Sequence, residues 1–570
     1  MIYKLKIKII VALFGVCCFT PAVSQNISGS YLAARQAVVH HDYRIATEYY
    51  ARALVQAPGN FGLLSQALSA FLAVGEFNKA LSIANLLETS GNDLPLANFV
   101  MLTADFKSGE YEQALARLSA GSVAGPAIDG LFEAWALMGL GKVGAALVKF
   151  DDIAAMEGTH SFAGYQKALA LALVGDFESA EELFAGAQKS PISVNARGSF
   201  ARAQILVQLD QNAKASAYLK KIHGVQGDPR SVAMRARFDA GANVGFDIVT
   251  SAAAGAGEVL FSFAEALRDG KAQDGLLLYA RMANYLQPRN VDTILLTAHL
   301  LEDLGSYELA NEAYNKVPRS HPYFVTAELG RADTLFQLED TNSAIEVLSQ
   351  LAQSFPNVRD VQESLGNARR QNGEYAEALT AYDAAISLID IPKIQDWYTY
   401  YVRAIAHERS GNWPAAERDF QGALALSSNQ FQVLNYLGYS LVERGERLDE
   451  ALSMISRAAI EKPDSGYIID SLGWVQFRLG QYSEAVINME RATELMATDP
   501  IVNDHLGDAY WAVGRKVEAR FQWRRSLSFI TSKTDLNDID PGRIERKLDV
   551  GLDQVLMDEG LAPLINSDGN

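Results

Sequence analysis

Cysteine is nearly absent from this chain of 570 residues. The two cysteines, Cys17 and Cys18, lie together near the N-terminus. The rest of the chain can therefore form no disulfide and supply no thiol nucleophile. The eight histidines are scattered, and no HExxH motif or Cys/His cluster stands at metal-ligand spacing. We therefore expect neither a metal site nor a cofactor.

Basic residues are also scarce, with 50 Lys and Arg against 68 Asp and Glu and a net charge of −18. A strongly acidic surface repels phosphate backbones, which excludes nucleic acid as the expected partner. Solubility is the simplest explanation of this charge, and a basic protein partner is the alternative.

Positive charge gathers at the N-terminus, ahead of a short apolar run. Lys4, Lys6 and Lys8 precede IIVALFGVCCF (9–19). This pattern predicts a signal peptide over residues 1–24, whose last residues, Ala-Val-Ser, are small enough for cleavage. Losing three lysines takes the net charge from −18 to −21. The run is too short for a permanent anchor, so we expect an exported protein, periplasmic or associated with the outer membrane, without an integral membrane span.

Alanine recurs in this chain at an interval near 34 residues. The series is Ala46, Ala80, Ala114, Ala146, Ala180, Ala310, Ala344, Ala378, Ala416, Ala451, Ala485 and Ala519. A glycine stands five residues before most of these alanines, and an aromatic residue often follows the glycine two positions later, as in GEF at Gly75. A period of this length is typical of a helical repeat array and predicts an all-α fold.

Each unit has the pattern of two packed helices. In the unit at 359–392, Leu365 and Gly366 lie on the apolar stripe of a first helix, and Ala378 and Tyr382 lie on that of a second. The small residues allow two helices to approach closely, and Tyr382 fills the space beyond them.

This pattern resembles the tetratricopeptide repeat, which carries Leu-Gly or a small pair and an aromatic in its first helix, and Ala, an aromatic and Ala in its second. LNYLGYSLVERG (434–445), DSLGWVQFRLGQYSEAV (470–486) and NDHLGDAYWAVGRKVEA (503–519) match it. The resemblance covers most of residues 27–530. It implies a right-handed superhelical solenoid of about 13–14 helical hairpins, which binds protein segments in its concave groove.

Two breaks in the register set the expected organisation. The Gly/Ala-rich run DAGANVGFDIVTSAAAGAGE (239–258) predicts a bend or flexible joint. Past residue 530, Asp540 and Pro541 are expected to be the N-cap and first residue of a capping helix. The predicted segments are a signal peptide (1–24), an N-terminal array (25–222), a degenerate joint (223–256), a C-terminal array (257–530), and a loop, capping helix and tail (531–570).

Two motifs imitate catalytic or cofactor sites. GLGKVG at 139–144 spells the dinucleotide-binding fingerprint, but it follows a helix rather than a strand. Asp504, His505 and Asp508 look like an acid–base set, yet they fall on adjoining faces of one expected helix. We expect both motifs to be structural.

The ligand-facing positions of the family, transferred by register, select a stripe of aromatic, acidic and amide residues. These are Tyr398, Tyr401, Gln432, Asn435, Tyr439, Tyr467, Asp470, Trp474, Phe477, Asp504 and Asp508. The aromatic residues would anchor a partner, and the aspartates would favour Lys or Arg in it. The alternative is that Tyr439 and Trp474 pack on the neighbouring helix. The family's carboxylate clamp uses Lys, Arg and Asn here, so the aspartates disfavour that ligand class.

The repeats leave no room for an independent catalytic domain. The chain looks most like large exported repeat proteins of proteobacteria, some of which are outer-membrane lipoprotein adaptors of carboxy-terminal processing proteases. Val16 before Cys17 fits a lipid-attachment signal poorly. We therefore expect a non-enzymatic scaffold or adaptor of the cell envelope, with a periplasmic protease or an envelope assembly component as partner. A structural part of an envelope assembly or of a polysaccharide or protein export machine is the alternative, and homo-oligomerisation is left open.

Overall fold

The computed structural model describes residues 27–121, 123–186, 195–225, 227–242, 244–268, 270, 273–531, 534, 538–561 and 564. Every regular element among these residues is a helix, which confirms the all-α repeat fold. The predicted signal peptide lies outside the described residues. The chain divides into two compact units, unit 1 (Met1–Ala344) and unit 2 (Ile345–Asn570).

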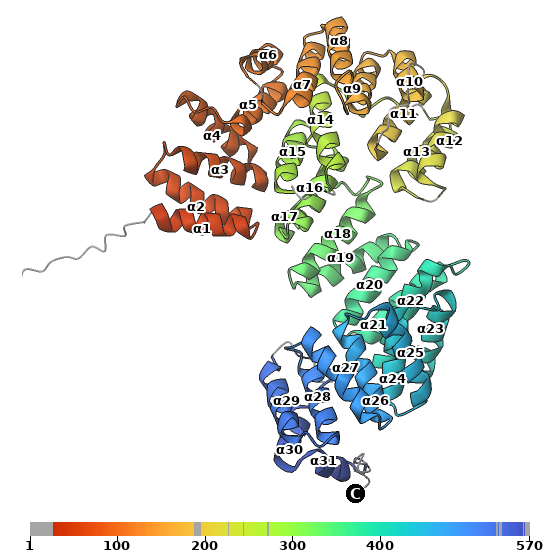
Figure 1. Cartoon of the computed structure of the whole chain (residues 1–570). Coiled ribbons are helices and arrows are strands. Elements are labelled where there is room, and N and C mark those ends of the chain that lie inside the picture. Colours follow the sequence, from red (N-terminus) through yellow and green to blue (C-terminus); the bar gives the residue numbers. More distant parts are fainter. Residues whose placement is uncertain are drawn as a thin grey trace, which may run out of the picture. The chain divides into compact units, whose positions relative to one another are not determined.

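Unit 1 is a succession of helical hairpins (Figure 1). Its helices are α1 (Ile27–Val39), α2 (Tyr43–Gln56), α3 (Phe61–Val74), α4 (Phe77–Thr89), α5 (Pro95–Ser108), α6 (Tyr111–Ala120), α7 (Pro126–Gly139), α8 (Val143–Ala154), α9 (His160–Leu173), α10 (Phe177–Ala185), α11 (Ala196–Gln208), α12 (Asn212–His223), α13 (Pro229–Asp239), α14 (Ala252–Ala266), α15 (Gln273–Leu286), α16 (Val291–Asp303), α17 (Tyr307–Tyr314) and α18 (Phe324–Gln337). The unit boundary falls within α19 (Thr341–Ser354).

The glycine and aromatic of the sequence pattern mark the turn of each hairpin. Gly75 ends α3 in the left-handed conformation, with φ of 93°. Its N–H bonds the Leu72 carbonyl, and the next N–H, of Glu76, bonds the Phe71 carbonyl at 2.9 Å. These bonds satisfy the last carbonyls of α3, and the chain then reverses so that Phe77 begins α4.

The recurring alanines form the contact between the two helices of a hairpin. Every alanine of the series with the 34-residue period has 0% of its surface exposed. In unit 2, a Cβ at Gly366 would overlap the ring of Tyr382, which is itself fully buried. The expectation that small residues make room for Tyr382 is confirmed.

Helices α14 and α15 pack against earlier helices of unit 1. Contacts join α14 to α5, α7 and α9, and join α15 to α3, α4 and α5 (Figure 1). In this way α14 and α15 cover part of α3, α5, α7 and α9, the first helices of four hairpins.

The segment predicted as a joint (223–256) contributes to this packing. Its described residues include α13 and the start of α14. A Cβ at Gly255 would overlap the fully buried Trp135 ring, and next to it Arg197 Nε donates to Glu258 at 2.7 Å. The compact units divide at Ala344, and the described residues of this segment pack within unit 1.

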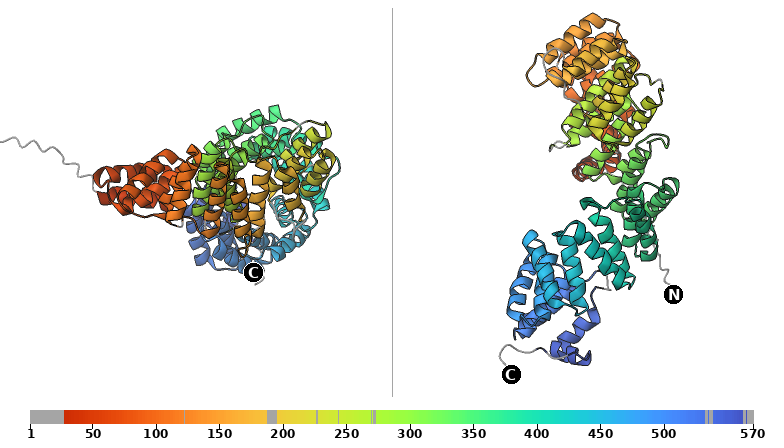
Figure 2. Two further views of the ribbon diagram at one scale, coloured as in Figure 1. Left: turned by 90° about the horizontal axis from the view of Figure 1, so that it is seen from above. Right: turned by 90° about the vertical axis from the view of Figure 1, so that its right-hand side faces the viewer.

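Unit 2 repeats the hairpin design. Its helices are α20 (Arg359–Gln371), α21 (Tyr375–Ser387), the 3₁₀-helix η1 (Ile394–Asp396), α22 (Trp397–Arg409), α23 (Trp413–Leu426), α24 (Phe431–Glu443), α25 (Leu448–Glu461), α26 (Gly466–Arg478), α27 (Tyr482–Leu495), α28 (Pro500–Ala512), α29 (Lys516–Phe529), α30 (Pro541–Val550) and α31 (Leu552–Asp558). The hairpins stack one after another (Figure 2). Helices α22, α24, α26 and α28 supply the first-helix face of the unit, with α24 contacting α26 and α26 contacting α28.

Two short helices follow the last hairpin. Asp540 accepts a hydrogen bond from the Arg543 N–H at 3.2 Å and caps α30, at the position expected for the capping helix. Gly551, with φ of 86°, separates α30 from α31, so one predicted helix is two. Leu552 and Val555 of α31 are buried, and Leu552 lies in a cluster with the last hairpin's Trp523.

Within the part of the chain that the structure describes, no helix combines the length and apolar character needed to cross a bilayer.

Candidate functional site

The residues predicted to face a ligand all lie on the first-helix face of unit 2. Helix α22 carries Tyr398 and Tyr401, α24 carries Gln432, Asn435 and Tyr439, α26 carries Tyr467, Asp470, Trp474 and Phe477, and α28 carries Asp504 and Asp508. In the structure some of them line a pocket, and others pack against neighbouring side chains of unit 2. Asp504 and Asp508 contact a lysine of α30.

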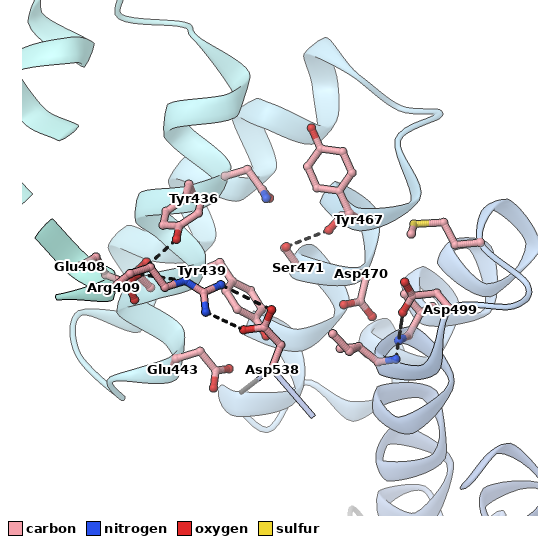
Figure 3. Close-up of a pocket in the computed structure, with 15 residues that line it drawn as sticks. Glu408, Arg409, Tyr436, Tyr439, Glu443, Tyr467, Asp470, Ser471, Asp499 and Asp538 are labelled. Carbon is pink, nitrogen blue, oxygen red and sulfur yellow. Dashed lines mark hydrogen bonds and ion pairs between the residues drawn. The ribbon is translucent and has the colours of Figure 1, made fainter. Parts of the chain in front are cut away.

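The pocket has a volume of about 450 Å³ and lies between α22, α24, α26 and the start of α28 (Figure 3). Four of the predicted residues line it: Asn435, Tyr439, Tyr467 and Asp470. Its other lining residues are Glu408, Arg409, Tyr436, Ser440, Glu443, Ser471, Met496, Asp499, Ile501, Val502 and Asp538. Most of these residues lie on α22, α24, α26 and α28, but at positions that do not face the ligand in the family's repeat.

One wall of the pocket comes from the loop before α30. Asp538 forms an ion pair with Arg409 of α22, with Nη1 and Oδ1 3.1 Å apart (Figure 3). Arg409 also lies beside Glu408, which accepts a hydrogen bond from the Tyr436 hydroxyl at 3.2 Å. The one guanidinium lining the pocket is therefore already paired.

The pocket is strongly acidic. Five carboxylates line it, from Glu408, Glu443, Asp470, Asp499 and Asp538, against the guanidinium of Arg409. Burial and the nearby carboxylates of Glu443 and Asp470 raise the pKa of Tyr439 above its ordinary value. Such a lining suits a cation with hydrogen-bond donors.

Asp470 has a buried partner behind the pocket. His505 Nδ1 lies 2.9 Å from Asp470 Oδ2, and both side chains are more than nine-tenths buried. Burial lowers the pKa of His505, but the charge and hydrogen bond of Asp470 outweigh this effect and raise the pKa to about 9. His505 is thus a charged structural partner, and its pairing with Asp470 on another helix was not predicted.

Trp474 and Phe477 pack within the unit. The Trp474 ring stacks on His505, with centroids 4.1 Å apart, and on Phe477, at 5.0 Å. Its indole N–H donates to Glu443 at 2.6 Å. Phe477 is 8% exposed and belongs to the core cluster of the last hairpins. These contacts favour the alternative in which Trp474 packs on its neighbours.

Asp504 and Asp508 are bound by the chain itself. Lys547 of α30 is fully buried, and its Nζ lies 2.8 Å from carboxylate oxygens of both aspartates. Asp508 also accepts a hydrogen bond from the Trp523 indole at 2.9 Å. The basic group expected opposite these aspartates is therefore intramolecular.

The tyrosines of the stripe differ in exposure. Tyr467 is 47% exposed and Tyr398 is 37% exposed, whereas Tyr401 packs in edge contact with Tyr436 at 6.0 Å between centroids. Tyr467 is the exposed aromatic at the pocket, and Tyr398 lies two hairpins earlier, on α22.

The glycine-rich motif that resembles a dinucleotide-binding fingerprint lies at a turn between two helices. GLGKVG at 139–144 spans the end of α7 and the turn to α8, where Gly141 has φ of 71°. Among the described residues, no group of three or more His, Cys, Asp and Glu is placed to hold a metal ion.

Fold and pocket together define a helical-hairpin repeat protein with an acidic pocket on its first-helix face. The tetratricopeptide repeat family model matches residues 295–358, 329–391 and 401–466. The TPR repeat-containing protein PA4667 of Pseudomonas aeruginosa is 28% identical over 194 residues, which are 32% of this chain and 31% of that protein. The chain thus carries tetratricopeptide repeats between residues 295 and 466, and these repeats support a role as a protein–protein interaction scaffold.

Solved structures with a related arrangement are more distant. The Cut9–Hcn1 hetero-tetramer of APC/C is 15% identical, covers 92% of this chain and 96% of its own, and has a TM-score of 0.38. Yeast Tom70 is 14% identical, covers 94% and 99%, and has a TM-score of 0.34. MamA from Desulfovibrio magneticus is 17% identical, covers 30% and 96%, and has a TM-score of 0.27.

Proposed function

We propose that this protein is a scaffold of the bacterial cell envelope that holds a partner protein on the first-helix face of unit 2, with a Lys or Arg side chain of the partner in the acidic pocket. The partner would be a periplasmic protease or an envelope assembly component. The interaction is non-enzymatic.

The observation that supports a Lys or Arg ligand is a pair of buried hydrogen-bond acceptors at the pocket. Asp470 is 5% exposed and Asn435 is 7% exposed. The Oδ1 atom of each has no hydrogen-bond partner among the described residues. A buried acceptor without a partner costs about 1–3 kcal/mol, which a donor from a ligand would recover. An ammonium or guanidinium group supplies such donors and also meets the negative charge of the lining.

Site-specific photo-cross-linking in cells tests the proposed face. A photoreactive phenylalanine is placed at Tyr467 or Tyr398, and at Phe521 as a control. Phe521 is 57% exposed on α29, a second helix outside the face. We expect adducts with one protein from 467 and 398 and none from 521, and a cross-linked segment that contains Lys or Arg. Equal adducts from 521, or a segment without a basic residue, would contradict the proposal.

The envelope location rests on the N-terminal lysines and apolar run. Intact-mass measurement on protein from the periplasmic fraction should give a chain beginning at Gln25 without a lipid. A chain that retains Lys4, or one with acyl groups on cysteine, would contradict it.

A further inference from the structure

A second cavity lies in unit 1, beside a buried arginine. Arg281 of α15 is 8% exposed and reaches the C-terminal end of α3, where its Nε donates to the Ala73 carbonyl at 2.8 Å. A guanidinium carries five N–H donors, and this bond uses one of them. Arg281 Nη2 is buried and has no hydrogen-bond partner among the described residues.

No described carboxylate forms an ion pair with Arg281. Burial lowers the pKa of Arg281 to about 10, and the charge of Glu312 opposes this effect only in part. The Glu312 carboxylate is engaged elsewhere, since it accepts from Arg44 Nη2 at 2.6 Å. A buried charge without a counter-ion is costly, so the site is electrostatically incomplete.

The cavity adds a second cation and an apolar wall. It has a volume of about 300 Å³, and its lining includes Arg281 and Lys316. Burial, and then the charge of Arg281, lower the pKa of Lys316. The rest of the lining includes Phe77 and Tyr285, whose rings stack with centroids 3.6 Å apart.

We propose that this cavity, the Arg281 pocket, binds an organic carboxylate that carries an apolar body. The carboxylate would accept hydrogen bonds from the free Nη2 of Arg281 and pair with Lys316. The apolar body would lie against the stacked rings of Phe77 and Tyr285. The carboxyl terminus of a peptide that ends in a hydrophobic residue has this chemistry, and inorganic phosphate lacks the apolar part.

Calorimetric titration of the full chain with three probes tests the proposal. The probes are N-acetyl-L-phenylalanine, its carboxamide, and inorganic phosphate. We expect the acid to bind about tenfold or more tightly than the carboxamide, because hydrogen bonds to charged groups are the stronger ones. Phosphate should bind more weakly than the acid, because it buries no apolar surface. Equal affinity for acid and carboxamide overturns the carboxylate assignment. Tighter binding of phosphate overturns the requirement for an apolar body.

Variants place the binding at this cavity. Arg281→Met should abolish binding of the acid, and Lys316→Met should weaken it while keeping Arg281 in place. Lys149→Met is the matched control, because Lys149 lies on α8, is partly exposed and pairs with Glu133. Acid binding that survives both Arg281→Met and Lys316→Met overturns the proposal. Should Arg281→Met fail to fold, Lys316→Met against Lys149→Met still decides. The outcome is independent of the cross-linking experiment, because that experiment probes unit 2.

Discussion

The ammonium group of Lys547 lies 2.8 Å from a carboxylate oxygen of Asp508, and both side chains are buried. Lys547 stands on α30, after the last hairpin, and Asp508 on the first helix of that hairpin. The chain therefore supplies its own cation to the end of the first-helix face. The pocket between α22 and α28 lies on the same face, and there the Oδ1 atoms of Asn435 and Asp470 have no hydrogen-bond partner among the described residues.

Replacing Lys547 should destabilise the end of unit 2. Lys547→Met leaves the buried Asp508 with only the more distant guanidinium of Arg543, 3.9 Å away, as a cation. Removing one partner of a buried ion pair costs about 3–5 kcal/mol. We expect faster amide hydrogen exchange in α30. Lys516→Met is the control, because Lys516 is 51% exposed, lies 3.7 Å from its partner Asp553, and such pairs contribute about 1 kcal/mol or less. Unchanged exchange in α30 of Lys547→Met would show that the pair is not structural.

The fold follows from local sequence to an unusual degree. The glycine, aromatic and alanine recur in register, and each position has the same physical task in every hairpin: Gly75 turns the chain, Phe77 begins the second helix and Ala80 is fully buried. A repeat needs contacts only within itself and with its neighbours, so such a pattern predicts it.

The contacts that complete the site could not be predicted in this way. Asp538 meets Arg409 across 129 residues, and Lys547 meets Asp508 across 39 residues, and no periodic pattern relates these positions. Gly255 illustrates a different limit. A small residue in a sequence is compatible with flexibility and with close helix approach, and only the Trp135 ring beside it distinguishes the two.

Two glycines of the predicted joint should respond differently to alanine. A Cβ at Gly255 would overlap Trp135, whereas a Cβ at Gly245 meets no atom within 4 Å. Overpacking costs about 1–3 kcal/mol. We expect Gly255→Ala to lower the melting temperature of unit 1 and Gly245→Ala to leave it unchanged, as followed by scanning calorimetry. A silent Gly255→Ala would favour a flexible joint, which limited proteolysis between 223 and 256 would then reveal.

The ion pair of His505 and Asp470 should make the stability of unit 2 depend on pH. The pKa of His505 in the folded protein, about 9, exceeds the ordinary value near 6.5. The pair therefore stabilises the fold fully below pH ~6.5 and loses this contribution as pH rises to about 9, a change of about 3 kcal/mol.

Denaturation of the wild type and His505→Gln across this range measures the effect. The difference in unfolding free energy should be largest near pH 6 and should shrink as pH approaches 9.5. His407→Gln is the control, because burial lowers the pKa of His407, and its difference should not vanish in this window. A constant difference for His505→Gln would contradict the ion pair.

Two aromatic residues of α26 should separate binding from packing. Tyr467 is 47% exposed, and its hydroxyl forms no hydrogen bond that ties it to a described neighbour, so Tyr467→Ala should leave the melting temperature nearly unchanged. If Tyr467 is a binding anchor, its loss should weaken the complex with the cross-linked partner by about 2 kcal/mol or more.

Trp474 stacks on two rings and donates to Glu443, so Trp474→Ala should destabilise unit 2 by about 3–5 kcal/mol. Calorimetry and a binding titration on both variants decide between the roles. If Trp474→Ala melts normally but no longer binds the partner, Trp474 belongs to the binding surface and not to the core.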